Sequence, residues 1–271
     1  MTPAQPAGSP GRALPGLQRQ GLVRYALALG DDALVLAQRC GSWITNAPQL
    51  EEDVALANIG LDLLGQARSL LTYAGQVEGA GRTEDDLAYV RDERDFLNLQ
   101  IVERPNEDFA VSTARLLLFS TYQLALYSAL AGSGDPTLAA VAAKAVKEVA
   151  YHRDHAAAWV VRLGDGTPLS HDRMQAGLER MWPYVEEMFD GSWLDDETGQ
   201  ALLADGVAVD PGSLRPGWEA FVRAVLDEAT LEVPSPRWHA RGGRRGVHSE
   251  AMGYLLAELQ HLHRSHPGAT W

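Results

Sequence analysis

Apolar residues recur at alternating spacings of four and three along most of the chain, which is the period of an amphipathic α-helix. The pattern predicts a first helix that ends near Trp43. The apolar stripe of this helix consists of Leu22, Ala26, Leu29, Ala33, Leu36, Cys40 and Trp43. No segment alternates convincingly with a period of two, so the sequence gives no sign of a β-strand.

A second helix is predicted after Pro48, with acidic residues in its first turn, where the helix dipole favours negative charge. Its stripe consists of Leu50, Val54, Ala57, Leu61, Leu64 and Leu71. Apolar side chains such as Ile59 and Leu63 also occupy the side opposite this stripe. Because a helix that is apolar all round is usually buried, we expect the second helix to be central in the fold.

Two more long helices follow in the pattern. Thr83 is predicted to cap a shorter helix through about Leu99, before a third long helix over Phe109 to Ala131. Asp135 and Pro136 then suit the N-cap and first position of a fourth long helix, which runs to Leu163 and carries His152 in its apolar stripe. Shorter helices are predicted near Arg173 to Phe189, Thr198 to Leu203, Pro216 to Leu231 and Ser249 to His266. Four long helices with short connections predict an all-α fold, a four-helix bundle with additional C-terminal helices.

Composition sets the domain organisation. A chain of 271 residues that is 46% hydrophobic has enough apolar surface for one large folded core. The first fifteen residues contain four prolines and no apolar run, so residues 1–17 are predicted to form a mobile N-terminal extension. Residues 18–271 are predicted to form a single helical domain.

Charge and cysteine content exclude several classes of function. The chain has 23 Lys and Arg against 36 Asp and Glu, and a net charge of −13 is unsuited to a nucleic acid or an anionic membrane surface. No window holds the roughly 18 uninterrupted apolar residues of a membrane span. Cys40 is the single cysteine, so the chain has no internal disulfide and no site built from several thiolates. We expect a soluble, cytoplasmic protein.

Long four-helix bundles raise the question of a di-iron carboxylate site. Such a site takes a Glu from each of two helices and a Glu-x-x-His pair from each of the other two. The first helix offers the shorter acids Asp31 and Asp32, and the second offers Asp62, but Gly65 stands three residues later. The predicted bundle therefore starts with an incomplete ligand set.

The other two long helices also lack ligands that a di-iron site needs. The third helix contains no acid and no histidine, and Gln123 is its nearest substitute for a ligand. The fourth helix has Glu148, but Tyr151 stands at i+3 and His152 at i+4. The bundle has the outline of a di-iron site without its ligands.

One set of polar residues falls on the faces of the long helices that are expected to meet. The set consists of Asp32, Asp62, Gln66, Gln123, Glu148 and His152. We interpret it as a hydrogen-bonded network in the bundle core, and a metal site with an incomplete ligand set is the alternative. Because a buried carboxylate without a partner costs several kcal/mol, Asp62 is predicted to pair with Arg39, Gln66 or His152.

Two C-terminal features offer further chemistry. Glu258 and His261 form the single literal Glu-x-x-His, which is compatible with a metal or, without a second copy, with a solvated or interface helix. Arg241, Arg244 and Arg245 surround glycines in a basic joint of an otherwise acidic chain. We interpret this joint as a solvated loop or a docking contact, and the alternative is that its guanidinium and backbone N–H groups hold a phosphate or a partner's carboxylates.

Several separated segments, in the same order, resemble the family of C subunits of bacterial phenylacetyl-CoA epoxidase. They are LGDDALVLAQR (Leu29 to Arg39), ALANIGLDLLGQAR (Ala55 to Arg68), RDERDFLNL (Arg91 to Leu99), KEVAYHRDH (within Lys144 to His155), GWEAFV (Gly217 to Val222) and the ending from GGRRGVHSEAMG onward. The resemblance spans nearly everything after residue 17.

The resemblance implies a ferritin-like fold and a non-catalytic structural role. In this family the chain pairs with a catalytic A subunit that holds the iron, while a B subunit and a reductase complete the oxygenase. No iron ligand is carried over to this sequence, since positions such as Gly65 and Tyr151 do not match, so no cofactor is expected in this chain. A large apolar interface with the A subunit is expected. The alternatives are a stand-alone acyl-CoA-binding scaffold and a di-iron oxygenase with an incomplete ligand set.

Overall fold

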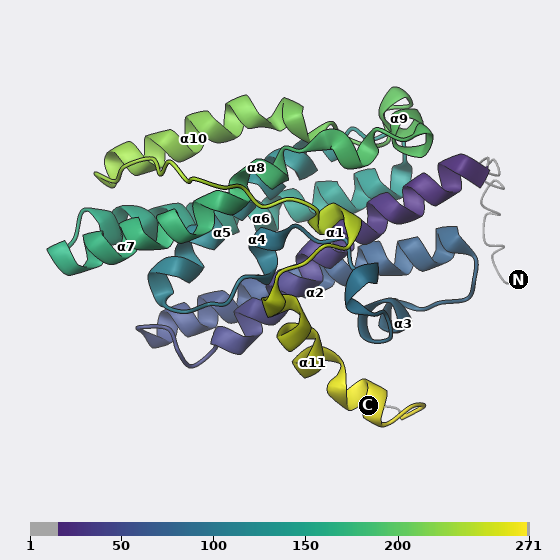
Figure 1. Cartoon of the computed structure of the whole chain (residues 1–271), viewed down its shortest axis with the longest axis horizontal. Coiled ribbons are helices and arrows are strands. Elements are labelled where there is room, and N and C mark those ends of the chain that lie inside the picture. Colours follow the sequence, from purple (N-terminus) through teal and green to yellow (C-terminus); the bar gives the residue numbers. More distant parts are fainter. Residues whose placement is uncertain (1–15, 270–271) are drawn as a thin grey trace, which may run out of the picture.

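The computed structural model describes residues 16–269, which form helices joined by turns and extended segments, with no β-strand in this range. Four long helices build the bundle: α1 (Gly16–Trp43), α2 (Leu50–Glu78), α5 (Phe109–Leu130) and α6 (Pro136–Gly164). Figure 1 shows them packed lengthwise, with α7 to α10 along the upper side in this view and α11 at the lower side near α3. The all-α bundle with additional C-terminal helices is thus confirmed. Residues 1–15 of the predicted extension lie outside the described residues, whereas Gly16 and Leu17 belong to α1.

Local capping residues start and stop these helices, and the predicted cap at Asp135 is among them. The Asp108 carboxylate caps α5 by accepting a hydrogen bond from the Val111 backbone N–H. Asp135 does the same for α6, where Pro136 takes the first position. Gly79 ends α2 in the left-handed conformation, with a φ of 71°.

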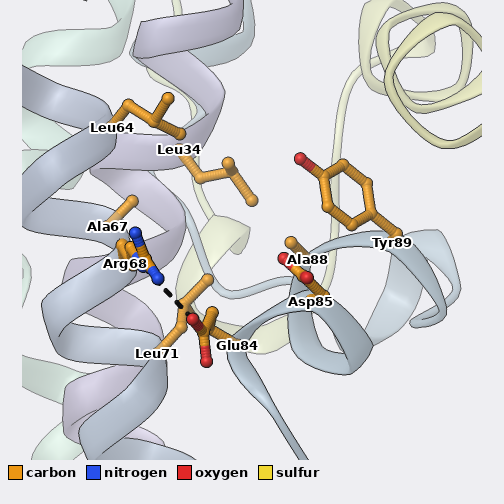
Figure 2. Close-up of a pocket in the computed structure, with 9 residues that line it drawn as sticks. All are labelled: Leu34, Leu64, Ala67, Arg68, Leu71, Glu84, Asp85, Ala88 and Tyr89. Carbon is orange, nitrogen blue, oxygen red and sulfur yellow. Dashed lines mark hydrogen bonds and ion pairs between the residues drawn. The ribbon is translucent and has the colours of Figure 1, made fainter. Parts of the chain in front are cut away.

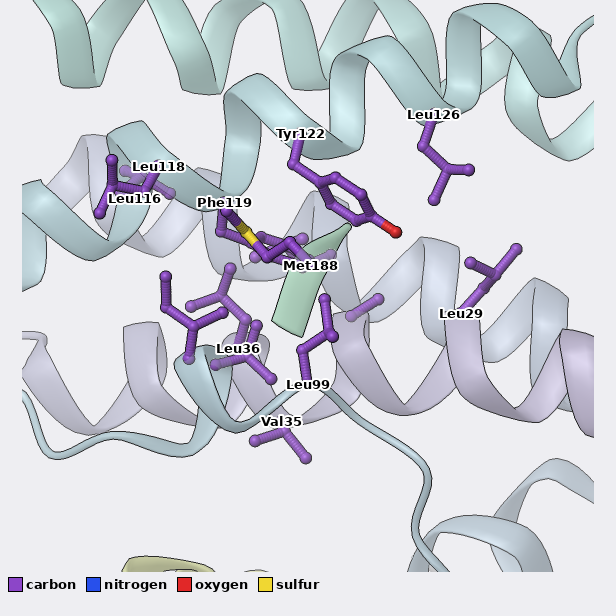
Figure 3. Packing of buried hydrophobic residues seen from close by; sticks show 14 of the residues in the cluster. Leu29, Val35, Leu36, Leu99, Leu116, Leu118, Phe119, Tyr122, Leu126 and Met188 are labelled. Carbon is purple, nitrogen blue, oxygen red and sulfur yellow. The ribbon is translucent and has the colours of Figure 1, made fainter. Parts of the chain in front are cut away.

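The hydrophobic core lies between α1, α5 and the segments that cover them. Figure 3 shows Leu29 and Leu36 of α1 facing Phe119 and Tyr122 of α5, with Met188 entering from the C-terminal region. By length and composition α5 would qualify as a membrane span, but 83% of its most apolar window is buried inside the structure. It is therefore the central core helix of this bundle.

The expectation that α2 is the central, all-round buried helix is wrong. Ile59 and Leu63 are fully buried, whereas Leu61 is 65% exposed and Leu64 is 44% exposed. The stripe that begins at Leu50 therefore faces outward over most of its length, and the opposite side packs into the core. The heptad spacing was correct, but spacing alone does not say which of two apolar faces is covered.

The predicted helix from Thr83 to about Leu99 is also wrong beyond its first turns. The segment contains α3 (Glu84–Tyr89), the 3₁₀-helix η1 (Glu93–Asp95), an extended stretch and α4 (Gln100–Glu103). The Asp31 carboxylate accepts the Leu97 backbone N–H at 2.9 Å, and Asp32 accepts that of Leu99 at 2.8 Å. Carboxylates of α1 thus replace the carbonyl partners that a continuous helix would have supplied.

The C-terminal region forms short elements, of which α7 and α10 pack against α5, α9 packs against α1, and α11 packs against α3 and α4. They are α7 (Pro168–Met181), η2 (Trp182–Tyr184), α8 (Val185–Met188), η3 (Gly191–Leu194), α9 (Glu197–Ala204), η4 (Pro211–Leu214), α10 (Arg215–Glu228), η5 (Gly243–Arg245) and α11 (Glu250–Ser265). The helix predicted over Arg173 to Phe189 is divided near Pro183, which lacks the N–H of a regular helix position. An extended strap after α10 returns along the molecule to η5 beside α1 (Figure 1).

Candidate functional site in the polar seam of the bundle

The long helices α2 and α6 are joined by polar side-chain pairs. Gln66 Nε2 donates to Glu148 Oε2 at 3.0 Å, and His152 Nε2 lies 3.0 Å from Asp62 Oδ2. The partners are four residues apart on each helix and run in opposite directions, so they form successive rungs between antiparallel helices. The predicted cross-helix partner of Asp62 is confirmed as His152, although the Asp62 side chain is 37% exposed rather than fully buried.

Helix α5 also contacts the Gln66–Glu148 pair. Gln123 Nε2 donates to Gln66 Oε1 at 3.1 Å, and both amides are buried. Gln66 thus accepts from α5 and donates to α6, which uses both ends of its amide. Three of the four bundle helices therefore meet through Gln66, Gln123 and Glu148.

Further pairs extend this polar seam along α2 and α6. His155 Nε2 lies 3.1 Å from Glu52 Oε2, and Tyr73 Oη donates to Asp135 Oδ2 at 2.5 Å. The tyrosine pair fixes the N-cap of α6 against the C-terminal part of α2. Sequence reasoning missed these two pairs.

The histidines of the seam are held in the neutral form. Burial lowers the pKa of His152, and the hydrogen bond to Asp62 offsets this only in part. Burial also lowers the pKa of His155. In the neutral His152 ring, Nε2 carries the proton because its partner is a carboxylate oxygen, and Nδ1 has no hydrogen-bond partner among the described residues.

Asp32, predicted as a member of the same network, lies elsewhere. Its Oδ2 accepts from Arg244 Nη2 at 2.6 Å, and this ion pair is buried. Arg244 also donates to the carbonyls of Ala28 and Leu97. The predicted network is therefore divided into the seam and a separate buried ion pair between α1 and η5.

The structure contradicts the expectation that Arg244 contacts a phosphate or a partner. It is 6% exposed, and its guanidinium is occupied by Asp32 and two carbonyls, so it is not free for a surface ligand. Arg245 is exposed and donates to Ser192, and Arg241 is exposed as well. A contact of Arg241 and Arg245 with a phosphate or a partner stays a prediction.

A second buried ion pair was missing from the sequence reasoning. His248 Nδ1 lies 2.8 Å from Glu103 Oε2, and His248 Nε2 lies 2.9 Å from the carbonyl oxygen of Phe96. Burial opposes a charge on His248, but Glu103 and Phe96 together raise its pKa above the usual value. Both ring nitrogens then donate, which ties the start of α11 to α4.

The side chains of the seam that could ligate a metal do not fit a di-iron centre. The bundle helix α5 contributes the neutral amide of Gln123, and the Glu148 carboxylate is directed to Gln66. Within residues 16–269, no three His, Cys, Asp or Glu side chains are grouped so as to hold a metal ion. Glu258 and His261 both lie exposed on α11, and their role as metal ligands or as part of an interface stays open.

Comparison with known proteins places this bundle in a family. The family model described as phenylacetic acid catabolic protein matches residues 8–271. The chain belongs to this family. A relative, the C subunit of the 1,2-phenylacetyl-CoA epoxidase of Escherichia coli (strain K12), is 49% identical over 250 residues, which cover 92% of this chain and 99% of the relative. Membership of the phenylacetic acid catabolic protein family confirms the resemblance drawn from the sequence segments.

Proposed function

We propose that this chain is the non-catalytic structural subunit of a phenylacetyl-CoA epoxidase. In the proposed complex it pairs with a catalytic A subunit of related bundle fold, which holds the iron, and a B subunit and a reductase join through that pair. The likeness to the C subunit of the Escherichia coli enzyme supports the choice of complex.

The observation that carries the non-catalytic role is the bonding of Gln66. Its amide connects Gln123 of α5 with Glu148 of α6, in the core region where a di-iron bundle would bring carboxylates and imidazoles together. A primary amide is a poor substitute for a carboxylate, because it brings no negative charge to balance the metal. The seam is suited to joining helices, and the outer surface remains available for a partner.

Metal content and assembly test this role. The chain is expressed alone and together with the A subunit in iron-rich medium, and iron is measured in each purified sample. We expect iron far below one atom per isolated chain, and about two atoms per pair of the A subunit with this chain in a stable complex. About two iron atoms in the isolated chain would contradict the non-catalytic role, and failure of the two chains to associate would contradict the pairing.

Activity of the assembled enzyme provides the second readout. Oxidation of phenylacetyl-CoA is measured for the A subunit with its B subunit and reductase, with and without this chain. We expect turnover only when this chain is present. Full turnover without this chain would contradict a structural role in the complex.

A further inference from the structure

Residues 233–239 connect α10 to the C-terminal part of the chain without a hydrogen bond to any residue that the structure describes. Before them, the Glu232 backbone N–H donates to Gln175 at 2.9 Å. After them, the Ala240 backbone N–H donates to the Pro183 carbonyl at 2.9 Å. Five of the seven side chains between these bonds are exposed. Because this segment can change its backbone angles without breaking hydrogen bonds, it is suited to act as a hinge, and we call it the hinge.

Three buried carboxylates hold the residues that follow the hinge. They are Asp32 of α1, Glu103 of α4 and Glu187 of α8. The Gly243 backbone N–H donates to Glu187 Oε1 at 2.7 Å. Arg244 Nη2 donates to Asp32 Oδ2 at 2.6 Å. The Ser249 backbone N–H, at the N-cap of α11, donates to Glu103 Oε1 at 2.6 Å. The C-terminal part is thus fixed to three different elements of the chain by carboxylates.

Two of these carboxylates also bind the segment before α4, on which the C-terminal part lies. The second oxygen of Asp32 accepts the Leu99 backbone N–H at 2.8 Å. The second oxygen of Glu187 accepts the Gln100 backbone N–H at 2.7 Å. These bonds do not involve the C-terminal part, so the segment before α4 stays attached to α1 and α8 when that part moves away.

The chain from α3 to α4 has further contacts of its own with the long helices. The Arg91 guanidinium pairs with Asp31 of α1, and Asp31 also accepts the Leu97 backbone N–H at 2.9 Å. Glu84, at the start of α3, pairs with Arg68 of α2 at 3.2 Å (Figure 2). The surface beneath the C-terminal part is therefore anchored in the bundle independently of that part.

Polar side chains attach α11 to the end of α3. Gln260 Nε2 donates to the carbonyls of Ala88 and Arg91, at 3.1 and 3.0 Å. Arg264 Nη2 donates to the carbonyls of Val90 and Arg91, at 2.8 Å each. A helix end leaves its last carbonyls without partners in the helix, and α11 supplies donors for those of α3.

Few apolar side chains of α11 are packed into the core. The buried ones are Met252, Leu255 and Leu256. Tyr254 and Leu262 are 69% and 54% exposed. Figure 1 shows α11 at the α3 side of the molecule, away from α5 and α6. Because an element with little buried apolar surface opens more easily than a core helix, α11 belongs to the less stable part of this fold.

We propose that residues 240–265 form a lid that opens as one unit about the hinge while the four long helices stay folded. Opening separates the lid from Asp32, Glu103 and Glu187 and frees the backbone carbonyls at the end of α3. The opening is cooperative because these carboxylates fix η5 and the start of α11 to one anchored surface. The lid does not depend on the proposed function, since all of its contacts lie within this chain.

Hydrogen exchange of the full chain, followed by mass spectrometry, measures the opening of the lid. Peptides from residues 243–249 and from α11 report on the two halves of the lid, and a peptide from α6 reports on the bundle. We expect the protection factors of the two lid peptides to agree within about threefold and to lie at least about 100-fold below that of α6. Lid protection equal to that of α6 would contradict a separate opening.

Variants at two distant contacts of the lid test whether it opens as one unit. Glu187→Gln replaces an oxygen that accepts a backbone N–H with an amide nitrogen that cannot accept one. Arg264→Gln removes the guanidinium that binds the end of α3. We expect each variant to lower the protection of both lid peptides by the same factor, about tenfold or more. A loss confined to the half of the lid nearest the changed contact would overturn the proposal.

The control and a core variant separate the lid from the bundle. Glu228→Gln, at an exposed position of α10, should change the protection of neither lid peptide by more than about twofold. Val149→Ala truncates a fully buried side chain of α6, and should lower the protection of α6 about tenfold while leaving both lid peptides within about twofold. Equal losses in α6 and the lid would show that the lid opens only by global unfolding, which would overturn the proposal. Circular dichroism establishes that each variant is folded.

Discussion

Asp32 and Arg244 are 212 positions apart in the chain and form a buried ion pair, with Arg244 Nη2 2.6 Å from Asp32 Oδ2. Asp32 also holds the Leu99 backbone through its other oxygen, at 2.8 Å. The pair therefore joins α1, the extended segment before α4 and the C-terminal strap. A feature that looked like a basic surface joint in the sequence is an internal connection of the fold.

Removing one partner of this pair is expected to destabilise the protein strongly. Arg244→Met leaves the Asp32 carboxylate buried without its cation, and we expect the free energy of unfolding to fall by about 3–5 kcal/mol. Urea denaturation measures this change. Arg245→Ala, at the exposed neighbour, is the matched control and is expected to change stability by less than about 0.5 kcal/mol.

The double variant Asp32→Asn/Arg244→Met tests whether the charge is the cause. It removes both charges but keeps an oxygen to accept the Leu99 N–H, so we expect it to be more stable than Arg244→Met alone. If the double variant is less stable than the single variant, the uncompensated charge is not the main cost.

His248 is predicted to make stability depend on pH above neutrality. Its pKa in the folded protein is raised above the unfolded value of about 6.5. The stabilisation is therefore fully present below the unfolded pKa and is lost as pH rises through the folded pKa. The stability difference between the unaltered chain and His248→Gln, measured in urea from about pH 5.5 to about pH 9, should shrink as pH rises.

His261 lies exposed on α11 and provides a substitution control. His261→Gln should change the free energy of unfolding by less than about 0.5 kcal/mol. A difference for His248→Gln that is constant across the pH range would show that the charged form of His248 is not what stabilises the fold.

The stability that His152 contributes is predicted to depend on pH in the opposite direction. Burial lowers its folded pKa below the unfolded value, so the stability it contributes is present above about pH 6.5 and is lost as pH falls through the folded pKa. Histidine NMR titration should place the midpoint of His152 below about 6.5 and that of His248 above it. The reverse order of midpoints would contradict the hydrogen-bond assignments of both rings.

An added carboxylate in the seam is expected to destabilise the bundle without creating an iron site. Gln123 is buried and donates to Gln66, and Gln123→Glu replaces that donor with a charged group of the same size. We expect the free energy of unfolding at about pH 7.5 to fall by about 2–4 kcal/mol, with recovery at lower pH as the acid is protonated. Gln76→Glu on the exposed side of α2 is the control.

Metal content distinguishes this outcome from a recovered di-iron centre. Gln123→Glu should hold no more iron than the unaltered chain, because the other donors of the seam remain unsuited to a metal pair. Unchanged stability at neutral pH together with bound iron would mean that the seam is one substitution from a metal site.

Much of the site followed from local sequence patterns, and the errors have a common cause. The acid-free α5, the Gly65 position and the cross-helix partner of Asp62 follow from helix spacing, which places i and i+4 on one face. The assignment of Asp32 to the seam failed because its partner lies on a strap more than 200 residues away. The Glu103–His248 pair was missed for the same reason, since its members are 145 residues apart.

Local sequence was sufficient to predict the long helices, their caps and the family, because these depend on interactions within a few residues or on ordered motifs. Only the packing of the folded chain shows which apolar face of α2 is covered. Ile59 and Leu61 are both apolar, but only Ile59 is packed into the core of this chain. Packing also directs Asp31 and Asp32 to backbone N–H groups and arginines rather than to a metal, since a side chain's partner is set by what the fold brings within hydrogen-bond distance.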